Sequence, residues 1–141
     1  EPGKAPDLAS NYAIVLDANT GNILYQKNAF DKQYPASITK IMTTLLALEN
    51  CSLDETVTFS KEAVYNTHGS GISRDVGEQM TMEECLYAVM LESANECAYA
   101  VAEHVGGTVE NFVQMMNDKA AELGCVNTHF NNPHPSLHLL L

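Results

Sequence analysis

Residues 18–22 read Ala-Asn-Thr-Gly-Asn and separate two runs of strand-forming residues, at 12–17 and 23–26. Asn and Gly accept the backbone conformations of tight turns, so the two runs are predicted to pair as a β-hairpin. A two-stranded hairpin is marginally stable by itself and needs further strands or a covering helix. The hairpin therefore has to be one part of a larger fold, and we expect some elements of that fold to be missing from the chain.

Apolar residues recur at helical spacing in four segments after the hairpin. The predicted elements are helices at 38–48, 81–92, 95–105 and 109–123, with a short strand at 56–59 and a loop at 68–71. Thr81 and Glu84 form a capping box ahead of the second helix. The third helix ends at the Gly-Gly pair 106–107, and the fourth ends at Gly124. The predicted class is α+β, an N-terminal hairpin followed by a helical cluster.

The charge and the cysteines of the chain exclude some functions. The formal net charge is −11, so the chain repels a phosphate backbone and no nucleic acid partner is expected. The cysteines show no C-x-x-C spacing, and Cys85 and Cys97 fall in apolar helical patterns, which favours small core thiols over metal ligands. We expect free thiols, and the three pairings of four cysteines stay open if the protein enters an oxidising compartment.

Ser37-Ile38-Thr39-Lys40 is an S-x-x-K motif at the expected start of the first helix, just after Pro35. Residues three apart on a helix share a face, so the Lys40 amine can reach the Ser37 hydroxyl. A desolvated lysine with a lowered pKa can take the serine proton, and a helix N-terminus favours an oxyanion beside Ser37. The motif predicts a nucleophile with its general base, although a capping serine followed by a solvated lysine gives the same pattern.

A second group of polar residues, Ser93-Ala94-Asn95, lies in the short break between two apolar helices. There Ser93 can relay a proton to a leaving group, and Asn95 can orient Lys40 or a substrate amide. The alternative is that both residues simply cap helices.

The remaining titratable residues are assigned no chemistry. The five histidines show no H-E-x-x-H spacing, which disfavours a zinc hydrolase, and His104 is expected to be a cation at a helix C-terminus. Most glutamates of the central helices are expected on solvent faces; the five are Glu83, Glu84, Glu92, Glu96 and Glu103. No metal site and no cofactor are predicted.

With these residues in place, the chain resembles the low-molecular-mass penicillin-binding proteins, the serine D-alanyl-D-alanine carboxypeptidases. The resemblance extends to His134 and includes the hairpin turn. It continues through residues 34–43, 77–81, 91–96, 102–107 and 130–134. Two catalytic motifs with matching flanks are far more specific than either motif alone.

The resemblance implies a partial penicillin-binding-protein or β-lactamase-like domain at 11–134, after a flexible leader at 1–10 and before an atypical tail at 135–141. It implies that Ser37 forms an acyl-enzyme with the penultimate D-alanine of a peptidoglycan stem peptide, with Lys40 as general base. Ser93 and Asn95 match the first and third residues of the family's S-x-N motif, which shuttles protons and holds the substrate. Ala94 replaces the usual glycine, a change that we expect to be tolerated.

The same resemblance implies partners and a location. The partners are stem peptides ending in D-Ala-D-Ala and the β-lactam antibiotics that mimic them. The location is extracytoplasmic, at the outer face of the bacterial cytoplasmic membrane, with the signal peptide removed.

The family's third motif, Lys-Thr-Gly, does not follow Asn95. In the family, that edge strand binds the substrate carboxylate and gives half of the oxyanion hole, so we expect little activity from these residues alone. Two alternatives stay open. One is a serine β-lactamase, and the other is a non-catalytic truncated or engineered fragment that forms homo-oligomers through the hairpin edge and the apolar tail.

Overall fold

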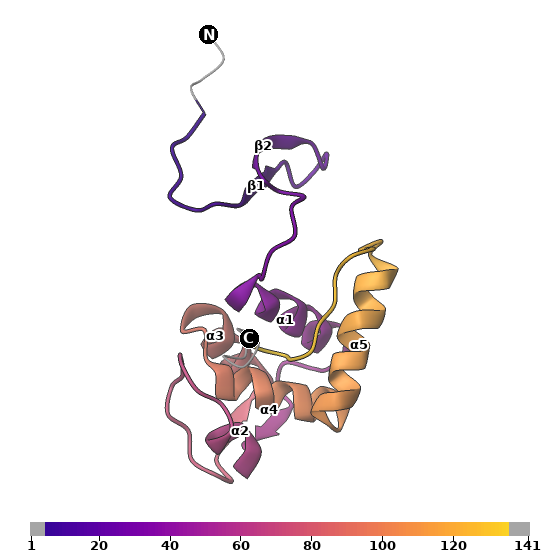
Figure 1. The fold of residues 1–141 in the computed structure, drawn as a ribbon. Helices are drawn as coiled ribbons and strands as arrows, with labels where there is room; N and C mark the ends of the chain where they lie inside the picture. Colours follow the sequence, from indigo (N-terminus) through magenta and orange to yellow (C-terminus); the bar gives the residue numbers. More distant parts are fainter. Residues whose placement is uncertain (1–4, 136–141) are drawn as a thin grey trace. The chain divides into compact units, whose positions relative to one another are not determined.

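The computed structural model describes residues 5–135 (Figure 1). They form two compact units, which divide between Tyr34 and Pro35 and are described separately. Residues 5–10, the described part of the predicted leader, have no helix or strand, and Leu8 accepts a hydrogen bond from Lys27 Nζ at 2.8 Å. The predicted tail from 136 to 141 lies outside the described residues.

The first unit contains the predicted hairpin. Strands β1 (Ala13–Leu16) and β2 (Ile23–Lys27) pair antiparallel. In the turn between them, the Asp17 carboxylate accepts hydrogen bonds from the backbone N–H and the hydroxyl of Thr20, both at 2.8 Å. Gly21 has a φ of 72°, a left-handed conformation that glycine adopts without a steric penalty. The turn chemistry of the sequence therefore fixes the hairpin, and this prediction is confirmed.

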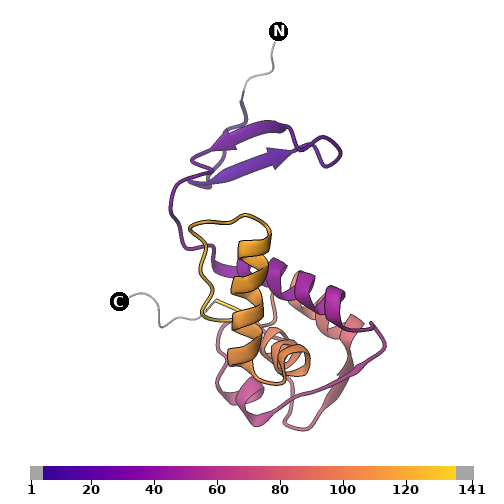
Figure 2. The ribbon, with the colours of Figure 1, turned by 90° about the vertical axis from the view of Figure 1, so that its right-hand side faces the viewer.

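The second unit is a cluster of helices with one small sheet. Its helical elements are η1 (Ala36–Ile38), α1 (Thr39–Asn50), α2 (Lys61–Tyr65), α3 (Met82–Leu91), α4 (Asn95–Gly106) and α5 (Val109–Glu122). Strands β3 (Thr56–Thr58) and β4 (Gln79–Thr81) pair antiparallel. Helix α4 lies between α1, α3 and α5, as the two views show (Figures 1 and 2). None of the helices within residues 5–135 is long and apolar enough to cross a membrane.

Helix α4 is central because most of its side chains are small and buried. The fully or almost fully buried residues of this helix are Cys97, Ala98, Ala100, Val101 and Ala102. Larger side chains from the neighbouring elements pack against them, among them Phe59, Met82 and Phe112. Small residues let neighbouring backbones approach closely, so three helices can surround one. Cys85 and Cys97 lie in this core, as predicted.

The end of α4 requires glycine twice. A Cβ added at Gly106 would lie 2.7 Å from the backbone nitrogen of Phe112, so no larger residue fits between α4 and α5. Gly107 has a φ of 74° and ends the helix in a conformation that glycine favours. The predicted stop at 106–107 is confirmed.

The four predicted helices and the strand at 56–59 are confirmed to within about three residues. Two short elements were not predicted, α2 and β4. Helix α2 has five residues and is capped by Ser60, whose side chain accepts a hydrogen bond from Ala63 N. Strand β4 has three residues, Gln79–Thr81, too few for alternation to be readable from the sequence. It exists because β3 pairs with it, with Val57 opposite Met80.

Candidate active site

Ser37 lies in the short turn that leads into α1. Pro35 precedes this turn, and Ala36 adopts a left-handed backbone with a φ of 50°. The turn is continuous with α1, because the Thr39 N–H donates to the carbonyls of Ala36 and Ser37. A non-glycine residue with positive φ costs about 1–3 kcal/mol, and such strained positions cluster at functional sites. The result is an exposed Ser37 side chain at the N-terminal end of a helix.

Lys40 lies one turn further along and is almost fully buried, with 2% of its surface exposed. Its Nζ lies 3.3 Å from Ser37 Oγ and 3.0 Å from Ser93 Oγ. Burial lowers the pKa of Lys40 below its ordinary value, and the negative charge of Glu96 partly opposes this. A lysine with a lowered pKa is neutral at lower pH than usual, and a neutral amine can accept the Ser37 proton.

Ser93 completes a triangle of polar atoms. It lies between α3 and α4, and its Oγ is 2.9 Å from Ser37 Oγ. Its φ is 55°, a second strained position beside the nucleophile candidate. The structure therefore brings Ser37, Lys40 and Ser93 together. When Lys40 is charged, it donates to both hydroxyls, and when it is neutral, it can accept from one of them.

Ala94 occupies the position at which the family that the sequence resembles usually has glycine. Its φ of −64° is an ordinary value for alanine, and the side chain is fully buried in the core. This backbone position does not require glycine, in agreement with the expectation that Ala94 is tolerated.

Asn95 makes its hydrogen bonds to the loop at 68–71, and none joins it to Lys40 within residues 5–135. Its Nδ2 donates to the carbonyl of His68 at 2.5 Å, and its backbone N–H donates to the carbonyl of Ser70 at 2.9 Å. Among residues 5–135, its buried Oδ1 has no hydrogen-bond partner. Asn95 thus holds the start of α4 to the loop at 68–71, and its role toward a substrate stays a prediction.

Glu96 was expected on a solvent face, and that expectation is wrong. The residue is buried, with only 6% of its surface exposed. Its Oε1 accepts hydrogen bonds from the backbone N–H groups of Ile72 at 2.5 Å and Ser73 at 3.0 Å. A Cβ at Gly71 would clash with the same carboxylate, so a larger residue there would displace the Glu96 side chain from its present position. Glu96 is the negative charge that raises the pKa of Lys40.

His134 also lies near Lys40. The sequence did not predict that these two residues are close. The hydroxyl of Thr43 donates to the carbonyl of Pro133 at 2.6 Å and holds this segment against α1. Burial lowers the pKa of His134; the adjoining Pro135 carbonyl opposes this, and the positive charge of Lys40 lowers the pKa further. The only signal in the sequence was the match of residues 130–134 to a family block.

Comparisons with known proteins identify the family of the chain. The peptidase S11 family model, described as D-alanyl-D-alanine carboxypeptidase, matches residues 2–136. The D-alanyl-D-alanine carboxypeptidase DacF of Bacillus subtilis is 40% identical over 126 residues, which is 86% of this chain and 32% of that protein. DacA of Haemophilus influenzae is 33% identical over 92% of this chain and 35% of its own length. The chain thus spans about a third of the length of these curated relatives.

Solved structures extend the similarity to the fold. The D-alanyl-D-alanine carboxypeptidase DacD from Francisella tularensis superposes with a TM-score of 0.85 at 33% identity, covering 96% of this chain and 34% of that one. The Streptomyces K15 DD-transpeptidase gives a TM-score of 0.85 at 33% identity, covering 94% and 55%. The predicted α+β class, as part of a penicillin-binding-protein fold, is confirmed.

Proposed function

We propose a serine carboxypeptidase function, from the premise that this chain belongs to the D-alanyl-D-alanine carboxypeptidase family, peptidase S11, whose model matches residues 2–136. The proposed reaction removes the terminal D-alanine of peptidoglycan stem peptides through an acyl-enzyme on Ser37. One observation carries the proposal. The Ser37 hydroxyl, the buried Lys40 amine and the Ser93 hydroxyl lie within 2.9 to 3.3 Å of one another.

In the proposed first step, the neutral Lys40 amine takes the Ser37 proton while Oγ bonds to the carbonyl carbon of the penultimate D-alanine. The carbonyl oxygen becomes an oxyanion beside the N-terminal end of α1, where backbone N–H groups favour negative charge. The C–N bond to the terminal D-alanine then breaks, and the proton passes from Lys40 through the Ser93 hydroxyl to the leaving amine. Water hydrolyses the Ser37 ester, with the same groups acting in reverse.

Lack of the second half of the oxyanion hole lowers the acylation rate that we expect from residues 1–141 alone. In the family it comes from the strand that carries Lys-Thr-Gly, and no such triplet follows Asn95 in this sequence. Loss of one oxyanion donor typically reduces kcat by about 10²–10³-fold. Acylation of Ser37 is therefore proposed to be slow in this chain and faster in a protein that contains the strand.

We also propose that β-lactams acylate Ser37 as mimics of the stem peptide, and that the protein acts outside the cytoplasmic membrane with its signal peptide removed. The substrate class supports this location, because peptidoglycan stem peptides ending in D-Ala-D-Ala are processed there. Protease accessibility of the protein in intact spheroplasts tests the location, and full protection from added protease would contradict it.

Labelling with a fluorescent penicillin followed by intact-mass measurement tests the nucleophile. We expect one penicilloyl group per chain in the wild type and none in Ser37→Ala, while the matched variant Ser10→Ala, in the first unit, labels like the wild type. Absence of an adduct on folded wild-type protein contradicts activity of these residues. Nitrocefin hydrolysis distinguishes the carboxypeptidase from the serine β-lactamase alternative. A β-lactamase turns nitrocefin over, whereas a carboxypeptidase stays acylated.

A further inference from the structure

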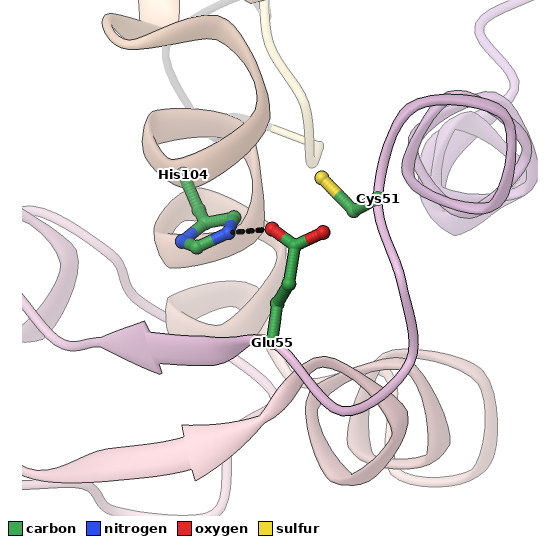
Figure 3. Close-up of side chains that lie close together, drawn as sticks. All are labelled: Cys51, Glu55 and His104. Carbon is green, nitrogen blue, oxygen red and sulfur yellow. Dashed lines mark hydrogen bonds and ion pairs between the residues drawn. The ribbon is translucent and has the colours of Figure 1, made fainter.

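A second cluster of reactive side chains lies elsewhere in the second unit, and it consists of Cys51, Glu55 and His104 (Figure 3). Cys51 follows the last residue of α1, Glu55 directly precedes β3, and His104 belongs to the last turn of α4. One ligand atom of each residue lies within 4.8 Å of the other two. Figure 3 shows the His104 ring joined to the Glu55 carboxylate, with the Cys51 sulfur beside the same carboxylate.

Backbone contacts hold this cluster in place. The Ser52 N–H donates to Glu55 Oε1 at 2.6 Å, which leaves Oε2 directed at His104 Nε2 at a distance of 2.8 Å. The Glu55 carbonyl accepts from the Met82 N–H at 2.8 Å, and the Cys51 N–H donates to the Ala47 carbonyl at 2.9 Å. His104 lies within α4, and backbone hydrogen bonds tie Cys51 and Glu55 to the ends of α1 and α3, so all three side chains project from restrained backbone, as a precise site requires.

The arrangement does not suit a cysteine nucleophile. An activated thiol needs a ring nitrogen as its base while a carboxylate holds the other ring nitrogen. Here the Cys51 sulfur and the Glu55 carboxylate lie on the same side of the His104 ring (Figure 3). Burial and the neighbouring Glu55 raise the pKa of the Cys51 thiol, so it is not a thiolate at neutral pH in the absence of a cation.

We propose that Cys51 Sγ, Glu55 Oε2 and His104 Nε2 bind one Zn²⁺ ion, with water as the fourth ligand. Zinc is bound by thiolate, imidazole and carboxylate in a tetrahedron, at about 2.3, 2.0 and 2.1 Å. Those lengths place the ligand atoms about 3.3–3.7 Å from one another. His104 Nε2 and Glu55 Oε2 lie 2.8 Å apart, closer than that range, and all three ligand atoms lie within 4.8 Å of one another, so the His104 and Glu55 side chains have to move apart to admit the ion.

The donor set selects zinc over the common hard cations. Calcium and magnesium prefer six or more oxygen ligands, whereas this cluster offers sulfur, nitrogen and one carboxylate. The thiolate and the carboxylate together cancel the charge of a divalent ion. The His104 and Glu55 side chains keep 26% and 41% of their surface exposed, which gives an ion and its water a path from solvent.

The role of the ion follows from the elements that it joins. Its ligands come from the end of α1, the segment before β3 and the end of α4, and Glu55 and His104 are 49 positions apart. Binding that occurs in the folded chain and not in the unfolded chain adds directly to stability. Zinc at the proposed site would therefore link three elements and stabilise the fold while one coordination position stays with water, and the proposal does not depend on the carboxypeptidase proposal.

Zinc binding is measured on the untagged, reduced chain by equilibrium dialysis against zinc chloride with elemental analysis, and by calorimetric titration. We expect one zinc per chain and a melting temperature that rises with zinc. Cys51→Ser and His104→Gln should each weaken binding at least about tenfold. The matched controls Cys125→Ser and His129→Gln, both at exposed positions, should bind like the wild type.

Cobalt provides a readout that is independent of stability. Co²⁺ bound to the wild type should give a thiolate-to-metal charge-transfer band, which Cys51→Ser abolishes and Cys125→Ser keeps. Circular dichroism verifies that each variant is folded before its affinity is interpreted, and Glu55→Gln serves as the third ligand variant if either of the others unfolds. Absence of stoichiometric zinc binding, or equal binding by Cys51→Ser and the wild type, would overturn the proposal.

Discussion

Lys40 Nζ lies 3.0 Å from Ser93 Oγ, although the two residues are 53 positions apart in the sequence. Lys40 belongs to the first turn of α1, and Ser93 belongs to the junction of α3 and α4. The contact exists because α1 and α3 both pack against α4, which brings the start of α1 beside the start of α4. The packing of the core thus sets the distance on which the proposed proton transfer depends.

Replacement of Lys40 by methionine should slow penicillin acylation of Ser37 by about 10²–10⁴-fold, the usual contribution of a general base. Methionine fills a similar volume without a charge, so the fold should be kept. The acylation rate is measured by stopped-flow or quenched labelling with fluorescent penicillin. Lys61→Met, at an exposed lysine of α2, is the matched control. An unchanged rate in Lys40→Met would show that another group takes the Ser37 proton.

The acylation rate should rise with pH, because only the neutral form of Lys40 can accept the Ser37 proton. Burial lowers the pKa of Lys40, so the rise should be centred below the ordinary lysine value of 10.5. The charge of Glu96 opposes that shift, and Glu96→Gln should therefore move the profile to lower pH. The measurement is the acylation rate of wild type and Glu96→Gln from pH 6 to about 10. A shift to higher pH in Glu96→Gln would contradict the electrostatic assignment.

The sequence predicted those features that depend on neighbouring residues. The capping box of Thr81 and Glu84 forms as predicted, with the Glu84 carboxylate accepting from Thr81 N at 2.8 Å. The S-x-x-K spacing likewise places Lys40 within 3.3 Å of Ser37, because one helical turn joins them.

Contacts between distant segments could not be predicted in the same way. Glu96 is buried because its partners, Ile72 and Ser73, lie more than twenty positions earlier in a loop without a regular pattern. Asn95 faces His68 for the same reason, since the loop at 68–71 closes over the start of α4. The proposed zinc ligands come from three elements, and no local spacing marks Cys51, Glu55 and His104 as a group.

The four thiols should react with iodoacetamide in an order set by burial. Cys125 is exposed and should be alkylated first, and Cys51 is half-buried and should follow. Cys85 and Cys97 are fully buried, so both should be protected in the folded chain. Their mutual hydrogen bond, in which Cys97 donates, raises the pKa of the Cys97 thiol and lowers that of Cys85, so Cys85 should be the more reactive of the two while this hydrogen bond is intact. Peptide mass mapping after timed alkylation, with a urea-unfolded sample as reference, gives the order. Early labelling of Cys85 or Cys97 would contradict the packing of α3 on α4.

Thr43 and Thr44 are adjacent in α1 and give a matched pair for a stability test. Thr43 donates a buried hydrogen bond to the Pro133 carbonyl at 2.6 Å, so Thr43→Val should reduce the free energy of unfolding by about 1–3 kcal/mol, because that carbonyl loses its donor. The buried hydroxyl of Thr44 has no hydrogen-bond partner among residues 5–135, so the isosteric change Thr44→Val should be neutral or stabilising. Urea unfolding of both variants measures the difference. Equal losses in the two variants would show that the Thr43 contact does not hold residues 133–134 against α1.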